Sequence, residues 1–170
     1  MTSEHSAQAR ALIASTRVLS LGVLVENGPH VGFLPYAVGE DPATLLVHAS
    51  KLARHSRGLL PGAEFSALIH ESDRGEGDPL QLRRVILQGR VVPLARDTGA
   101  YHAARERYLA RLPSAEVTCR LGDFTLFALH GIVDLRTGMP RLGVDPSIER
   151  LLPEGDEERA FFDRARQLFG

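Results

Sequence analysis

The chain is poor in several features that mark particular classes of protein. Its 170 residues include one cysteine, Cys119, so they form neither an internal disulfide nor a cysteine-based zinc site. No apolar run approaches the length of a membrane span, and the N-terminal residues lack the basic-then-apolar order of a signal peptide. The formal net charge of −1 gives no general attraction to nucleic acid or to an anionic membrane. We therefore expect a cytoplasmic protein with neither nucleic-acid nor membrane partners.

The bulk composition is typical of a soluble globular protein, with 44% hydrophobic and 24% charged residues. A chain of 170 residues can bury a core without disulfides or metal ions. We expect one domain over residues 1–170, with a core at 9–144 and a helical tail at 146–170.

Aliphatic and β-branched segments predict a series of strands joined by tight turns. Residues 17–25 and 30–38 flank Asn27-Gly28, and an Asn-Gly pair between apolar segments is a strong β-hairpin signal. Strands joined by tight turns are antiparallel, and closing them into a barrel removes exposed edges. The sequence thus predicts a mainly β protein, a barrel of about six to seven strands with peripheral helices. Further strands are predicted at residues 44–49, 64–70, 82–94, 123–136 and 139–144, with Gly89 and Gly131 as bulges.

Helical periodicity predicts the peripheral helices. One covers residues 4–15 with Ser3 as its N-cap, and another covers residues 98–112 with Asp97 as its N-cap. A third is predicted at residues 156–169.

A basic segment follows the third predicted strand. The apolar run at residues 45–47 turns abruptly into a polar stretch in which Lys51, Arg54 and Arg57 recur at a spacing of three. That spacing brings the three cations together on one helix surface, with Ser50 in the N-cap position. A helix N-terminus beside convergent cations is suited to bind a phosphate. The alternative is an ordinary solvated amphipathic helix, which shows the same spacing.

Three short motifs and the order of the elements resemble one family. Pro35-Tyr36 ends the second strand, Asp78-Pro79-Leu80 precedes the aliphatic strand that runs to Gly89, and the basic segment has the pattern Ser-x-Leu-Ala-x-His-Ser at residues 50–56. In this order they resemble the FMN-binding split barrel of the pyridoxamine 5′-phosphate oxidase-like superfamily, in particular its bacterial haem-utilisation oxygenase-like branch. The resemblance covers roughly residues 9–144.

The resemblance implies a flavoprotein oxidoreductase that acts on a small-molecule substrate. It implies a homodimer that binds FMN at the subunit interface, with the phosphate held at the start of the segment after the third strand. The flavin ring would lie along the second strand and meet a polar residue early in the fifth. No catalytic acid or base is indicated, since the cofactor performs the difficult step. The cofactor-binding residues implied are Leu34, Pro35, Tyr36, His48, Ser50, Arg54, His55, Ser56, Arg57 and Arg84.

Physical chemistry agrees with this assignment. A phosphate dianion needs several charge-assisted donors, and the planar guanidinium of arginine supplies two in one plane. Arg84 near a flavin ring would stabilise the negative charge of the reduced form. Arg83 and Arg84 point to opposite faces of their strand, so at most one of them addresses the ligand.

Departures from the family pattern leave other functions open. Gly32 and Ala37 stand where pyridoxamine phosphate oxidases carry an Arg and a Lys, so vitamin B6 oxidation is not expected. The alternatives are a haem-binding or haem-degrading protein of the same fold, and a cofactor-free dimeric binding module. No histidine follows His130 to serve as the C-terminal iron ligand of the haem-degrading relatives. The histidines lack the spacing of a metal site, so no metal is expected.

Overall fold

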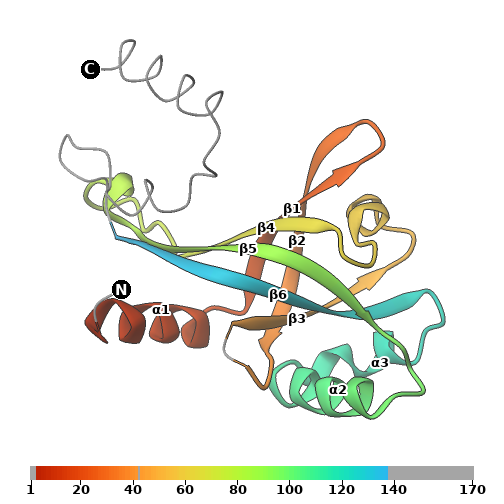
Figure 1. The fold of residues 1–170 in the computed structure, drawn as a ribbon. Coiled ribbons are helices and arrows are strands. Elements are labelled where there is room, and N and C mark those ends of the chain that lie inside the picture. The colour runs from red at the N-terminus through yellow and green to blue at the C-terminus, as the bar shows by residue number, and fades with distance from the viewer. Residues whose placement is uncertain (1–2, 42, 138–170) are drawn as a thin grey trace. The chain divides into compact units, whose positions relative to one another are not determined.

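A computed structural model describes residues 3–41 and 43–137, and in it six antiparallel strands form a closed barrel (Figure 1). The strands follow one another around the barrel in the order β1-β2-β3-β6-β5-β4, and pairing of β1 with β4 closes it. The predicted mainly β barrel with peripheral helices is confirmed. The predicted strand at 139–144 and helix at 156–169 lie outside the described residues. The strands are β1 Val18–Val25, β2 Gly28–Val38, β3 Thr44–Ser50, β4 Glu64–His70, β5 Arg83–Leu94 and β6 Phe124–Thr137.

Helices and short 3₁₀ turns occupy the connections. No helix in the described ranges is long and apolar enough to cross a bilayer. The helices are α1 Ser3–Ser15, α2 Gly99–Arg111 and α3 Glu116–Cys119, and the 3₁₀ turns are η1 Arg54–Gly58, η2 Pro79–Gln81 and η3 Pro113–Ala115.

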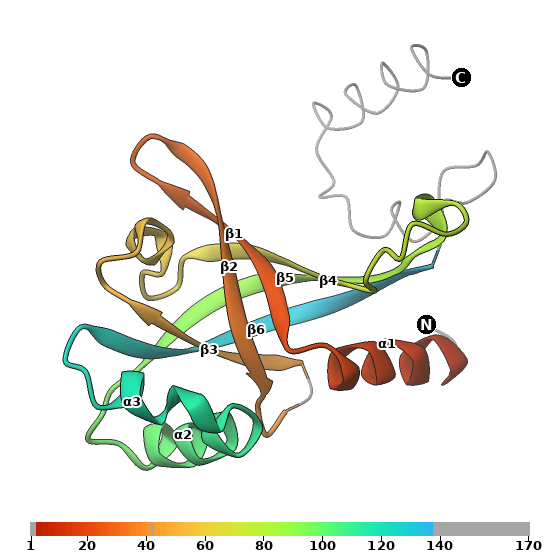
Figure 2. The same ribbon diagram turned by 180° about the vertical axis from the view of Figure 1, so that it is seen from behind.

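The β1–β2 hairpin forms where the Asn-Gly pair predicted it. Val25 pairs with Gly28 across a two-residue loop of Glu26 and Asn27, and Gly28 has a φ of 111°. A residue with a side chain rarely adopts this backbone conformation, so glycine suits the turn. The tip of the hairpin extends past the other strands, with η1 beside it (Figure 2).

Alternate residues of the strands fill the barrel. In β1 and β4 every second residue is buried. Each apolar side chain that is removed from water stabilises the fold by roughly 1.5–3 kcal/mol. The fully enclosed residues include Leu21, Leu45, Val47, Ile69, Val85, Leu87, Val91 and Leu129.

A second apolar cluster lies between the outer face of the barrel and α2. Because α2 covers this face, β3 is buried on both sides, which explains its uninterrupted apolar run. The N-cap of α2 is Thr98, whose hydroxyl accepts the Tyr101 N–H at 3.2 Å, so the expected cap Asp97 is wrong by one residue. The cluster comprises Ala37, Leu46, Tyr101, Ala104, Tyr108, Leu112, Leu126 and Ala128.

Gly89 and Gly131 are not bulges. They face each other in an unbroken register between β5 and β6, so the expectation of extra residues at these points is wrong. A Cβ built on Gly89 would lie 1.9 Å from the His130 carbonyl oxygen, and one on Gly131 would lie 3.0 Å from that of Gln88. Glycine is present here because the two backbones approach too closely for a side chain.

Candidate functional site

The basic segment after β3 forms a five-residue 3₁₀ turn, η1, in place of the predicted N-capped helix. Its N-cap is Ala53, which provides no side-chain cap. Ser50 is the last residue of β3, where its hydroxyl donates to the Asp123 carboxylate at 2.6 Å and accepts the Leu52 N–H at 3.1 Å. The Ser50 N-cap is therefore wrong, and so short a turn has almost no helix dipole. Any anion binding here depends on the cationic side chains.

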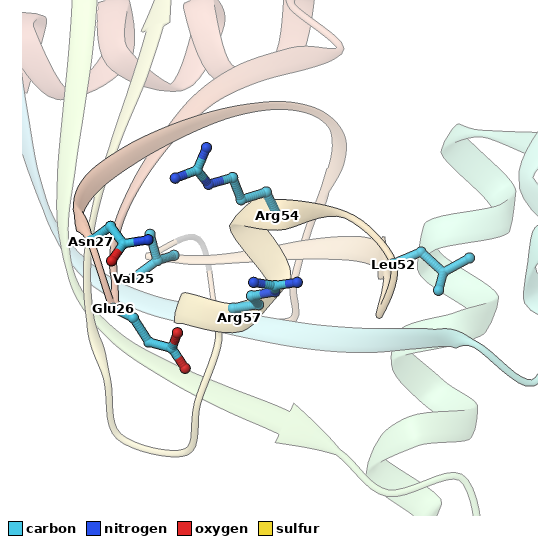
Figure 3. A pocket seen from close by; sticks show the side chains of 6 residues that line it. All are labelled: Val25, Glu26, Asn27, Leu52, Arg54 and Arg57. Atoms are coloured by element: carbon cyan, nitrogen blue, oxygen red, sulfur yellow. The ribbon is translucent and has the colours of Figure 1, made fainter.

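Arg54 and Arg57 line one hollow of about 360 Å³, which we call the arginine pocket (Figure 3). Residues three apart lie on the same face of a 3₁₀ helix, which allows both arginine side chains of η1 to line this hollow. Within the described part of the chain, neither group has a carboxylate within 4.0 Å. The rest of the wall consists of Val25, Glu26 and Asn27 from the hairpin tip, and Leu52.

His55 and Ser56 anchor η1 to the barrel. The Ser56 hydroxyl donates to the Ser50 carbonyl at 2.6 Å. The imidazole of His55 lies over Gly32 of β2, where a Cβ would be 2.7 Å from its Cγ. Burial lowers the pKa of His55, and the neighbouring His30 lowers it further. Both effects favour the neutral form of His55.

Leu34 and Tyr36 point into the protein. Leu34 belongs to the barrel core, and the Tyr36 hydroxyl donates to the Ile13 carbonyl at 2.7 Å. Pro35, in contrast, is exposed, and its carbonyl accepts the Tyr108 hydroxyl at 3.4 Å. The side chains of Leu34 and Tyr36 therefore serve packing, and a contact of this strand with a flavin ring stays a prediction.

His48 lies beneath α2 and α3, and it is not part of the arginine-pocket wall. Its side chain is 7% exposed, its ring packs 4.9 Å from that of Phe124, and its Nε2 has no hydrogen-bond partner within the described ranges. Burial, followed by repulsion from Arg96 and Arg105, lowers the pKa of His48 to about 4. His48 is thus a neutral imidazole packed against Tyr108 of the second apolar cluster.

Arg84 is likewise outside the arginine pocket. Arg84 lies opposite His70 in the backbone register between β5 and β4. Its guanidinium donates to the Leu80 carbonyl at 3.3 Å. Arg83 points the other way and pairs with Glu71, whose pKa it lowers, chiefly by a hydrogen bond. As predicted for a strand, the two arginines do not act together.

The structure therefore brings together two of the ten predicted residues, Arg54 and Arg57, with η1 held by His55, Ser56 and Ser50. The sequence reading did not identify Glu26 and Asn27 as site residues. The Asn-Gly signal located the hairpin, but no local pattern indicated that its tip lies against η1.

Solved structures of several other proteins resemble this chain. No family model matches the chain, and no curated protein matches its sequence. Among solved structures, a haem-binding protein from Mycobacterium smegmatis matches 81% of the chain at 27% identity and a TM-score of 0.64. HutZ, the haem storage protein from Vibrio cholerae, matches 78% at 20% identity and a TM-score of 0.68. A FAD- and haem-binding protein from Mycobacterium smegmatis matches 83% at 15% identity and a TM-score of 0.58.

These similarities define the class of protein. The chain has the same split-barrel fold as these neighbours, which is the fold that the predicted resemblance implies. Membership of the pyridoxamine phosphate oxidase-like superfamily and of its haem-utilisation branch stays a prediction. Neighbours with this fold bind haem or FAD. The match spans 93% of HutZ, 60% of the first Mycobacterium smegmatis protein and 75% of the second.

Proposed function

We propose that the chain binds FMN and is an oxidoreductase acting on a small molecule. The observation that carries the proposal is the arginine pocket, where two guanidinium groups without an acidic partner in the described chain line the same hollow. A phosphate dianion satisfies such a pair because each guanidinium donates two charge-assisted hydrogen bonds. Asn27 adds an amide to the wall, while Val25 and Leu52 add apolar surface.

When bound, the flavin would supply the redox chemistry, and the protein would bind and orient it. Arg54 and Arg57 would hold the phosphate. The carboxylate of Glu26 on the same wall repels any anion, so binding depends on the two guanidinium charges outweighing this one negative charge.

Haem is the second candidate, and one observation favours it. The haem-binding protein from Mycobacterium smegmatis is 27% identical over 81% of this chain. Haem propionates are carboxylates, which arginine binds as readily as phosphate. The same two arginines would then hold the propionates.

We further propose that the chain is a homodimer, as the resemblance implies. The cofactor-free binding module remains as the reading to adopt if neither cofactor binds. A cytoplasmic location likewise stays a prediction.

The first experiment is the visible absorption spectrum of the purified full chain, followed by titration with FMN and, separately, with hemin. A two-banded flavin spectrum or saturable FMN binding supports the leading proposal. A saturable Soret shift with hemin, without FMN binding, replaces it with the haem proposal. A protein that binds neither refutes both.

The arginine pocket itself is tested by R54A and R57A. Removing one charge-assisted partner costs about 1.5–3 kcal/mol, so we expect each variant to weaken FMN binding by roughly 10- to 100-fold. The matched control is R107A, which removes an exposed arginine of α2. Equal affinities in R54A, R57A and R107A would contradict this phosphate site.

A further inference from the structure

His55 and Gly32 interlock at the point where η1 meets the barrel. The His55 ring occupies the space next to the Gly32 Cα, so a Cβ there would lie 2.7 Å from Cγ, 2.8 Å from Nδ1 and 3.0 Å from Cβ of His55. No strand residue with a side chain fits at position 32 without displacing the imidazole. The fit depends on glycine at one position and on a flat ring at the other.

η1 depends on such contacts for its position. It has five residues and no side-chain N-cap, and a single 3₁₀ turn is not stable by itself. Its far end is docked in a similar manner, because a Cβ on Gly58 would lie 2.6 Å from the Leu24 carbonyl oxygen and 2.8 Å from the Val23 Cβ. Contacts with β1 and β2 therefore determine where η1 lies.

The two arginines flank the docked histidine. Arg54 precedes His55 directly and Arg57 follows it by two positions, and both line the arginine pocket, which His55 does not. Because His55 lies between the two arginines in η1, we expect a shift of its ring off Gly32 to displace both guanidinium groups. Two donors bind one anion well only when both stand at the right distance from it.

We propose that His55 is a positioning residue, whose ring seated on Gly32 holds Arg54 and Arg57 in the geometry that binds an anion. The inference rests on the proposed function only for the anion site, and not for the identity of the cofactor. His55 acts through its shape and has no direct contact with the ligand. Glycine is required at position 32 only while the His55 ring is present, because it leaves room for this ring.

Sulfate is a suitable probe, because it stays a dianion across the working pH range and is not a cofactor. Binding is followed by NMR on the arginine side-chain signals of the full chain. We expect H55A and G32A each to weaken sulfate binding about tenfold, a loss of about 1.4 kcal/mol. In the H55A background, G32A should change the affinity by less than about twofold, since no ring remains to be displaced.

The variant H55F separates positioning from direct contact. Phenylalanine keeps a flat ring over Gly32 but has no nitrogen, so we expect sulfate affinity within about twofold of the wild type. Affinity as low as that of H55A would show that the imidazole contacts the anion, and would overturn the proposal. The control G22A alters a strand glycine of β1 whose added Cβ meets Ser66 and no atom of η1.

Other outcomes are equally decisive. Equal effects of G32A with and without His55, or no sulfate binding by the wild type, would overturn the proposal. If G32A does not fold, the comparison of H55A with H55F decides alone. Sulfate binding with the expected variant pattern, but no binding of FMN or hemin, would uphold this inference and refute the proposed function.

Discussion

At the scale of single residues, two histidines predicted for one site have different roles. His48 is buried beneath α2 against Tyr108 of the second apolar cluster, whereas the ring of His55 packs between η1 and Gly32 of β2. Burial is the largest cause of the lowered pKa in both. An imidazole held neutral in the folded state links stability to pH.

The lowered pKa of His48 predicts that the folded protein loses stability in mild acid. Its pKa is about 4 in the folded protein and near 6.5 when the chain is unfolded, so between these values the unfolded state binds the extra proton. The free energy of unfolding should therefore fall as pH decreases from about 6.5 towards 4, by roughly 2–3 kcal/mol in total. Urea unfolding at pH 7.5, 6 and 5 measures this decrease.

The variant H48L isolates this contribution, because leucine does not titrate. We expect a shallower decrease of unfolding free energy with pH in H48L than in the wild type. The control H102Q removes an exposed histidine of α2 and should keep the wild-type slope. A slope unchanged by H48L would show that His48 is not the buried titrating group.

At the scale of elements, hydrogen bonds from the barrel and α2 dock the C-terminus of α1. The Tyr36 hydroxyl donates to the Ile13 carbonyl and lies 2.8 Å from the Thr16 hydroxyl oxygen. The guanidinium of Arg111 donates to the Ala14 and Ile13 carbonyls at 2.9 and 3.3 Å, and also to that of Thr16. These donors satisfy carbonyls that a helix end otherwise leaves without partners.

We expect Y36F to lower the free energy of unfolding by about 1 kcal/mol, because the Ile13 carbonyl loses the nearer of its two donors and keeps only Arg111 at 3.3 Å. The amide protons of α1 should also exchange faster with solvent, since the helix end is less firmly docked. The matched control is Y101F, because the hydroxyl of this buried tyrosine makes no hydrogen bond with any described residue. Equal stability of Y36F and Y101F would mean that this hydrogen bond does not dock α1.

At the scale of the whole molecule, the outer face of the β1–β2 hairpin is apolar and exposed. Phe33 is 71% exposed, and β1 residues of the same face lie opposite its neighbours in the hairpin register. Contiguous exposed apolar surface of this kind commonly marks a protein–protein interface. Its exposed apolar residues are Val18, Leu24, Pro29, Val31, Phe33 and Pro35, and Ser20 and Gly22 lie opposite Phe33 and Val31 on the same face.

We propose that the homodimer forms through this face. Light scattering should show a mass of two 18.6 kDa chains for the wild type, and a mass of one chain for F33D, because a buried unpaired carboxylate disrupts an apolar interface. The control V117D places the same charge at a residue of α3 that is 70% exposed. A wild-type monomer, or F33D as dimeric as V117D, would refute the proposal.

The local sequence predicted much of the fold. Period-two burial, the Asn-Gly turn and the apolar run that begins β3 each depend on neighbouring residues, and each produced a strand close to its predicted bounds. Lys51, Arg54 and Arg57 were predicted to share one face, and a spacing of three does place Arg54 and Arg57 on one face in both α and 3₁₀ geometry. Lys51 lies before η1 and is not part of the arginine-pocket wall. Because this spacing does not distinguish an α-helix from a 3₁₀ turn, it did not locate the start of the helical segment, and the predicted Ser50 N-cap was wrong.

Tertiary structure alone decided the remaining features. Gly89 is required by the approach of β6, and Gly32 by the ring of His55, although both glycines resemble ordinary strand glycines in sequence. The wall of the arginine pocket joins residues 25–27 to η1, and the side chains of Leu34 and Tyr36 point into the core because of the strand's orientation in the closed barrel. Periodicity and turn signals are local and determine the elements. Contacts between residues distant in the chain arise only when the barrel closes, so they determine which side chains form a site.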